Sequence, residues 1–166
     1  MDPTTDNQSI TPETRPVIEA LKRFAARPDV MLALNQARHE AEQELQRNPG
    51  LATAWVGLDP ARLGWAELHT VGSMRVVVTR DADSQRVERH ANSMQYLLVL
   101  DGPVETHVET IDGWRVDRYG QGNSAGLEDR WHVVPRGAWH RTVAPGARNW
   151  GIAAFHSARE VSDEYR

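Results

Sequence analysis

Two short stretches of this chain carry residues that could bind a metal ion or move a proton. The first contains Glu88, His90 and Gln95, and the second, Pro135-Arg136-Gly137-Ala138-Trp139-His140, runs from a turn into a histidine. Side chains two residues apart on a β-strand point to the same face, so Glu88 and His90 are expected to point together. Gln95 begins the next predicted strand, and His140 enters from a neighbouring one. We therefore expect four polar side chains to converge in a pocket otherwise built from apolar residues.

The residue types in this group suit a divalent cation. Imidazole and carboxylate are good ligands for Fe(II), Mn(II), Ni(II) or Zn(II). The carboxamide of Gln95 is a weak, neutral ligand, but Glu88 supplies a carboxylate and so keeps a set of two histidines and one carboxylate. The sequence predicts that Glu88, His90, Gln95 and His140 hold one divalent metal ion. The alternative is a metal-free site, in which both histidines are merely hydrogen-bonded pocket residues.

The elements that must position these residues follow from the hydrophobic pattern. From about residue 65 the period is two, and turn signals such as Asp101-Gly102-Pro103 and Asp112-Gly113 separate short runs. The predicted strands are Trp65–Val71, Arg75–Arg80, Gln85–His90, Gln95–Leu100, Val104–Ile111, Trp114–Tyr119, Arg130–Val134, Trp139–Val143 and Asn149–His156. Short strands with this punctuation indicate an all-β fold, a sandwich or an antiparallel β-barrel.

The residues before the strands have a helical pattern. One helix is predicted from Thr11 to about Ala26. Pro28-Asp29 interrupts the pattern, and a second helix then runs to about Gln46, where Asn48-Pro49-Gly50 ends it. This N-terminal pair of α-helices is expected to pack outside the barrel or in a dimer contact. The predicted organisation is a disordered tail over 1–12, a helical region over 13–64 and the barrel over 65–166.

Composition excludes several classes of function. The chain has 166 residues, a net charge of −4 and no cysteine, which disfavours nucleic-acid binding and excludes disulfides and thiolate metal sites. No apolar run approaches the ~20 residues that span a bilayer, and the first residues show no signal peptide. We therefore expect a cytoplasmic protein without membrane or nucleic-acid partners. Exposed edge strands of a small barrel favour a homodimer.

The spacing Glu88-x-His90-x4-Gln95-x6-Gly102, followed by Pro135-x-Gly137-x2-His140, resembles the two motifs of the cupin superfamily. Those motifs read H-x-H, three or four residues, E, six residues, G, and then P-x-G-x2-H. The resemblance implies a single small cupin barrel, the double-stranded β-helix or jelly roll. The second motif is complete, whereas Glu88 stands at a histidine position and Gln95 at the glutamate position. These departures weaken the inference of a metal more than that of the fold.

A narrower resemblance is to the 4-hydroxylaminobenzoate lyase group. It rests on His90, Asn92, Ser93 and Gln95, followed by Trp131-His132-Val133-Val134-Pro135 and Trp139-His140. Members of that group convert an aryl hydroxylamine to a catechol acid and release ammonia. The resemblance implies a small aromatic acid as substrate and a role in aromatic compound catabolism. Glu88, with His90 or His140, would then supply the acid and the base.

Other side chains are candidates for substrate contact. They are Asn92, Gln95, Trp131, Trp139 and Arg141. Tryptophan could stack on an aromatic ring, and arginine could pair with a carboxylate. The competing interpretation is a turn residue for Asn92 and core residues for the two tryptophans. His132 and His156 could line the pocket or be ordinary strand histidines.

Three functions compete. A lyase acting on 4-hydroxylaminobenzoate would yield protocatechuate and ammonia without consuming oxygen. A metal-dependent dioxygenase would consume oxygen and need Fe(II). A non-catalytic, small-molecule-binding cupin would turn nothing over and would tolerate the loss of Glu88.

Overall fold

The computed structural model describes residues 7–80, 86–121, 126–146 and 149–166. Two long helices come first, and strands make up most of the rest. The elements in chain order are α1 (Arg15–Ala25), α2 (Pro28–Arg47), β1 (Thr53–Leu58), β2 (Ser73–Thr79), β3 (Glu88–His90), β4 (Gln95–Val99), β5 (Val104–Thr110), β6 (Gly113–Tyr119), α3 (Leu127–Arg130), β7 (Trp131–Val134), β8 (His140–Val143), β9 (Trp150–His156) and β10 (Asp163–Tyr165).

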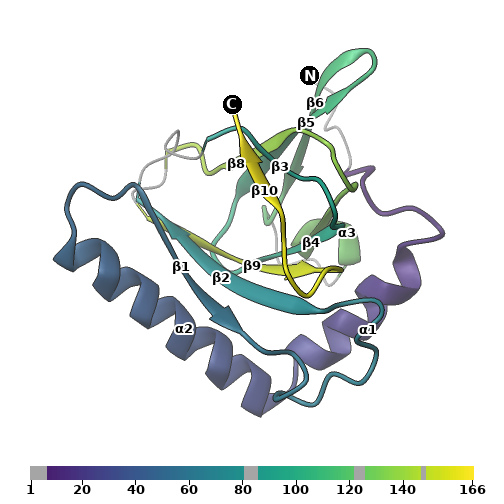
Figure 1. The fold of residues 1–166 in the computed structure, drawn as a ribbon. Coiled ribbons are helices and arrows are strands. Elements are labelled where there is room, and N and C mark those ends of the chain that lie inside the picture. The colour runs from purple at the N-terminus through teal and green to yellow at the C-terminus, as the bar shows by residue number, and fades with distance from the viewer. Residues whose placement is uncertain (1–6, 81–85, 122–125, 147–148) are drawn as a thin grey trace.

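These strands form two antiparallel sheets. The first sheet has the order β1-β2-β9-β4-β7 and the second has the order β10-β3-β8-β5-β6. The two sheets face one another, and α1 and α2 lie across the outer face of the first sheet (Figure 1). Strands close in sequence are thus divided between the sheets, as in a jelly roll. The predicted all-β fold with an N-terminal pair of helices is confirmed.

Apolar side chains fill both spaces between the layers. One core cluster joins the helices to the first sheet and includes Leu21, Leu34 and Phe155. A second cluster lies between the sheets and includes Leu97 and Ile152. Because the first sheet is covered on both faces, every residue of β4 and β9 is buried. This explains why the sequence of these strands is apolar almost throughout rather than alternating.

The helices behave as their pattern predicts. The apolar residues of α2 recur at helical spacing, and the stripe that they form is buried along its whole length; its members are Val30, Leu34, Ala37, Ala41 and Leu45. The rest of α2 is largely polar and faces outward. The helix pair therefore covers one face of the first sheet. The opposite face of that sheet is left to form a site.

The strand predicted at Trp65–Val71 is wrong. These residues form turns, in which the amide of Thr70 donates to the carbonyl of Glu67 at 2.8 Å. Trp65 is buried because its ring packs edge-on against Phe24 at 5.2 Å, so its burial reflects a helix contact and not a strand. The strand instead is β1, which lies inside the range expected to be helical and pairs with β2 along its whole length.

Both ends of the chain also differ from expectation. Residues 1–6 of the predicted tail lie outside the described residues, as do Gln85 at the start of a predicted strand and part of the loop at 120–123. Asn7 and Ser9, also expected to be disordered, are buried. The carboxamide of Asn7 donates to the carbonyl of Trp131 at 2.6 Å, and the amide of Val133 donates to the hydroxyl of Ser9 at 2.9 Å. These two polar side chains tie the chain's start to β7.

The last strand, β10, was not predicted, because its residues are mostly polar. Asp163, Glu164 and Tyr165 pair with β3 through backbone hydrogen bonds, which need no apolar pattern. In the described part of the chain, no helix is both long enough and apolar enough to cross a membrane.

Candidate metal centre

Backbone pairing brings the two sequence motifs together. In the second sheet, Glu88 of β3 lies opposite His140 of β8, and His90 follows two residues after Glu88 on the same face. The ligand atoms of these three side chains all lie within 4.8 Å of one another. The predicted convergence of Glu88, His90 and His140 is confirmed, although the two motifs are far apart in the chain.

Gln95 approaches the same group from the first sheet. It is the first residue of β4, it is buried, and it lines the same cavity as Glu88 and His90. Its carboxamide oxygen, Oε1, has no hydrogen-bond partner among the described residues. The predicted inward direction of Gln95 is therefore confirmed.

Hydrogen bonds fix which nitrogen each histidine presents. His90 Nδ1 lies 2.8 Å from Asp163 Oδ1, and His140 Nδ1 lies 3.1 Å from the carbonyl oxygen of Ala138. Because both oxygens accept, both Nδ1 atoms carry a proton and both Nε2 atoms keep a lone pair. These Nε2 atoms lie 3.9 Å and 3.6 Å from Glu88 Oε1, which is too far for a hydrogen bond.

The residues present fit a divalent cation. Nε2 of His90 and Nε2 of His140 are buried without a hydrogen-bond partner in the described part of the chain. Such atoms are unusual, because a polar group that loses water without gaining a partner costs free energy. A cation held by both Nε2 atoms and the Glu88 carboxylate would satisfy all three groups. Two imidazoles and one carboxylate are a recognised set for first-row metals.

His156 is the site residue that sequence reasoning weighted too low. It ends β9 directly opposite Gln95, and its ring meets that of His90 at a right angle, with centroids 4.8 Å apart. Both of its ring nitrogens are buried and lack hydrogen-bond partners among the described residues. A lone histidine on a predicted strand gave no reason to single it out. The available signal was its spacing from Ala154 and Ile152. Residues two and four apart on a strand point to the same face, which here is the face toward the cavity.

Burial keeps these imidazoles neutral. Desolvation lowers the pKa of His90, and the Glu88 and Asp163 carboxylates only partly oppose this shift. Desolvation also lowers the pKa of His156 well below its ordinary value, with His90 and Arg75 adding to the effect. A neutral imidazole is the form that binds a metal ion, so His90 is ready to bind one without first losing a proton.

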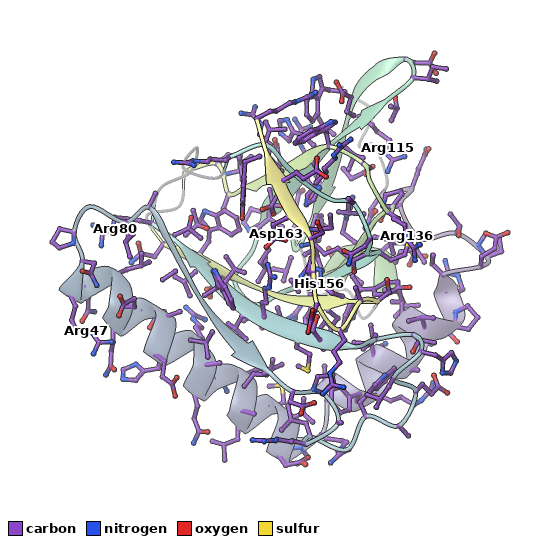
Figure 2. The ribbon with its side chains drawn as sticks, in the orientation of Figure 1. Arg47, Arg80, Arg115, Arg136, His156 and Asp163 are labelled. Carbon is purple, nitrogen blue, oxygen red and sulfur yellow. The ribbon has the colours of Figure 1, made fainter. Side chains whose placement is uncertain are left out.

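A cavity of about 410 Å³ opens onto this group. Its inner end is formed by Glu88, His90, Gln95 and His156, all of them buried or half-buried. Its outer end carries exposed side chains, among them Trp55, Arg86 and Tyr165, and its walls are apolar at Val77, Ile152 and Ala154. In Figure 2, His156 at the end of β9 and Asp163 on β10 are labelled near the middle of the view. This volume is in the range of pockets for small organic ligands.

Four residues predicted to contact a substrate lie elsewhere, which corrects that expectation. Asn92 is exposed, and its side chain bridges the backbone of Glu160 and Ser162. Trp131 packs against Phe155 on the helix side of the first sheet.

The other two lie on the outer side of the second sheet. Trp139 is half-buried between the guanidinium groups of Arg89 and Arg166, at 4.8 Å and 4.7 Å. Arg141 alternates with inward-facing His140 and pairs in register with His107. Strand alternation therefore removes Arg141 from the cavity, just as it removes Arg89.

His132 is buried in a separate polar cluster. Its Nε2 donates to Asp117 Oδ2 at 2.9 Å, and its ring stacks on Tyr119. Arg115 also donates to Asp117 Oδ2. His132 does not line the cavity, so its role is to satisfy a buried carboxylate inside the sandwich.

The fold defined by these two sheets is the cupin fold. No family model matches the chain, and no curated protein matches it in sequence. Solved structures do match. Oxalate decarboxylase of Bacillus subtilis superposes with a TM-score of 0.53 and 12% identity, over 70% of this chain and 28% of that one. The Lactobacillus farciminis oxalate decarboxylase, in a formate complex, superposes with a TM-score of 0.52 and 16% identity, over 69% of this chain and 31% of that one.

A third match is shorter and closer in length to this chain. Peruvianin-I from Thevetia peruviana latex, described as a cysteine peptidase, gives a TM-score of 0.53 and 15% identity, over 70% of this chain and 68% of that one. This chain has no cysteine and cannot share that chemistry. Identities this low show the fold alone, and this chain spans less than a third of the two decarboxylases. The comparisons support the cupin fold and not the 4-hydroxylaminobenzoate lyase group.

Proposed function

We propose that this protein is a metal-dependent cupin enzyme that acts on a small aromatic acid. Glu88, His90 and His140 would hold one divalent ion, with Gln95 and His156 beside it. The observation that carries the proposal is the pair of buried Nε2 atoms, each oriented by a hydrogen bond at Nδ1 and each lacking a partner among the described residues. One of the matching solved structures, of the Bacillus subtilis oxalate decarboxylase, is described as having Mn(II) centers, which supports a metal ion at this site.

The ligand set favours Fe(II), Mn(II) or Zn(II) over a hard cation such as Mg²⁺, because imidazole prefers the first group. When bound, such an ion acts as a Lewis acid that polarises a substrate oxygen or lowers the pKa of a water molecule. The chain's own residues would then bind the substrate in the cavity, exclude water from its inner end and move protons there.

The particular reaction that we propose is the conversion of 4-hydroxylaminobenzoate and water to protocatechuate and ammonia. This reaction balances without an oxidant, because the N–O bond, the ring C–N bond and one ring C–H bond break while two ring C–O bonds form, so the reduction of the N–O group offsets the oxidation of the ring. It needs an acid for the departing N–O oxygen and a base for the attacking water. Glu88 lies beside the imidazoles of His90 and His140 and can serve one role, while His90 or His140 serves the other. Glu88 can act so only if it is not fully committed to a metal.

A ring-cleaving or related dioxygenase is the second candidate. The observation that favours it is the ligand set itself, since two histidines and one carboxylate are typical of non-haem Fe(II) oxygenases. Oxygen uptake that depends on added Fe(II) would identify this activity. Ammonia release without oxygen uptake would identify the lyase.

Metal analysis is the first experiment. The protein is purified without a histidine tag, and its metal content is measured by mass spectrometry before and after dialysis against a chelator. We expect close to one first-row metal ion per chain, lost in the Glu88→Gln and His140→Ala variants. Wild-type protein that neither contains such a metal nor takes one up would contradict the proposed centre. The homodimer and the cytoplasmic location remain predictions.

A further inference from the structure

Two arginines at the cavity are not used by the proposed metal centre. Arg75 and Arg86 both line the cavity that holds Glu88 and His90. We infer that Arg75 and Arg86 form an anion-binding subsite that takes the carboxylate of a small, flat organic acid. This inference deepens the proposed function, because it names the group by which the substrate of that site is recognised.

Arg75 is held rigidly with its guanidinium at the cavity wall. It lies on β2, and its Nη1 donates to Asp163 Oδ2 at 2.8 Å. Its guanidinium also lies over the ring of Trp55, 4.7 Å from the centroid. The side chain is 19% exposed, so it is partly removed from bulk water. A guanidinium has five N–H donors in a planar fork, which leaves donors beyond the one used by Asp163.

Arg86 provides the second charge, nearer to solvent. It is exposed, and it precedes Glu88 by two residues on the approach to β3. Within the described ranges it has no ion-pair partner. An arginine beside a pocket that forms no ion pair within these ranges can bind a carboxylate through two parallel hydrogen bonds.

The charge balance of the site favours an anion. Around the cavity as a whole, the two guanidinium groups of Arg75 and Arg86 offset the carboxylates of Glu88 and Asp163. A divalent ion bound by the proposed ligands would leave an excess of two positive charges. An anionic substrate would reduce this excess, and in a partly desolvated pocket that attraction is stronger than in water.

The remaining walls define the body of the ligand. Val77, Ile152 and Ala154 offer an apolar surface on the cavity wall, and the exposed Trp55 indole also lines the cavity. These groups offer few hydrogen bonds, so they suit a hydrocarbon ring rather than a sugar or a phosphate ester. The class of ligand that fits is an aromatic or similarly flat monocarboxylate.

Binding of benzoate tests the subsite, with benzamide as the neutral probe of the same shape. Titration is followed by calorimetry and by the intrinsic tryptophan fluorescence, to which Trp55 at the cavity contributes. We expect benzoate binding to weaken by about 10-fold or more in Arg75→Gln and in Arg86→Gln, because each variant loses a charged hydrogen bond. Benzamide binding should change little. Equal benzoate affinity in the wild type and both variants, or an equal loss for both probes, would overturn the inference.

Two controls make this result specific. Arg136→Gln removes a charge from an exposed arginine that does not line the cavity, and it should leave benzoate binding unchanged. Arg86→Gln changes an exposed side chain, so it keeps the test valid even if Arg75→Gln disturbs Asp163 and the fold. Thermal unfolding of each variant reports whether the fold is kept.

The titrations are run on metal-free and on Mn(II)-loaded protein, so the subsite and the metal centre can fail separately. Arginine-dependent benzoate binding to the metal-free protein supports the subsite even if no metal ever binds. A protein that binds Mn(II) but holds benzoate equally well without either arginine keeps its metal centre and loses the subsite.

Discussion

Asp163 on the last strand accepts a hydrogen bond from His90 Nδ1 at 2.8 Å and, through its other oxygen, a bond from Arg75 at 2.8 Å. One carboxylate thus orients a proposed metal ligand and a proposed substrate-binding arginine. The backbone pairing of β10 with β3 places Asp163 directly opposite His90. The C-terminal strand β10 therefore contributes a side chain to the site, in addition to extending the sheet.

Replacing this carboxylate should weaken metal binding. Asp163→Asn keeps the size of the side chain but removes the charge that orients His90. We expect metal affinity to fall by about 10- to 100-fold, the usual effect of losing such an outer partner. Competition with a fluorescent chelator measures this change. Glu164→Gln, which alters the neighbouring residue paired with Arg89 on the outer face, is the matched control. Equal affinities in the two variants would remove Asp163 from this role.

The proposed ligands should be needed for turnover and not for folding. We expect Glu88→Gln and His140→Ala each to lower the catalytic rate by at least ~10²-fold on the substrate identified by screening. Circular dichroism and thermal unfolding should show that both variants keep the fold. His107→Ala is the control, because that histidine lies on the outer face of β5. Full activity in either variant would exclude that residue from the mechanism.

His156 is expected to lower the stability of the metal-free fold while it supports metal binding. Its two buried nitrogens lack partners among the described residues, so they destabilise the metal-free fold. We expect His156→Leu to raise the melting temperature of the metal-free protein while it lowers metal affinity. Differential scanning calorimetry with and without Mn(II) measures both effects. A variant that is destabilised without metal and binds metal normally would show that His156 serves only the packing.

Acid should destabilise the metal-free protein through His132. Burial lowers the pKa of His132 below its ordinary 6.5, although the Asp117 carboxylate opposes this shift and Arg115 and His140 reinforce it. Below about pH 6.5, His132 therefore takes up a proton in the unfolded chain but stays neutral in the folded chain until the pH falls to its lower folded pKa. Stability is present above that pH and is lost as the pH falls toward the folded pKa.

Urea unfolding between pH 4 and pH 8 measures this dependence. We expect His132→Gln to flatten the decrease, by at most about 1.4 kcal/mol per pH unit for one proton. The pKa of Asp117 is lowered from 3.8 by His132 and Arg115, despite its burial, so that carboxylate stays charged across this window. His39→Gln changes an exposed histidine and should leave the slope unaltered. An unchanged slope in His132→Gln would contradict the expectation.

Much of the fold could be predicted from local pattern. Short apolar runs, some alternating and some continuous, located β2 and most of the strands from β4 onward, and helical spacing located both helices and the buried stripe of α2. The errors have a common cause. An apolar residue stands at position 65 because Trp65 packs against a helix and not because it lies on a strand. The strand β10 can be polar because backbone pairing, rather than apolar burial, holds it in the sheet. Neither cause is visible in the period of the sequence.

The sequence by itself determined the residue types and spacing of Glu88, His90, Gln95 and His140, and it implied that they share a face. Only the tertiary structure decided that His156, Asp163, Arg75 and Arg86 join them, and that Asn92, Trp131, Trp139 and Arg141 do not. The physical reason is that alternation along one strand is a local property. Which strands become neighbours depends on how two sheets pack and pair, and that is settled by the whole chain.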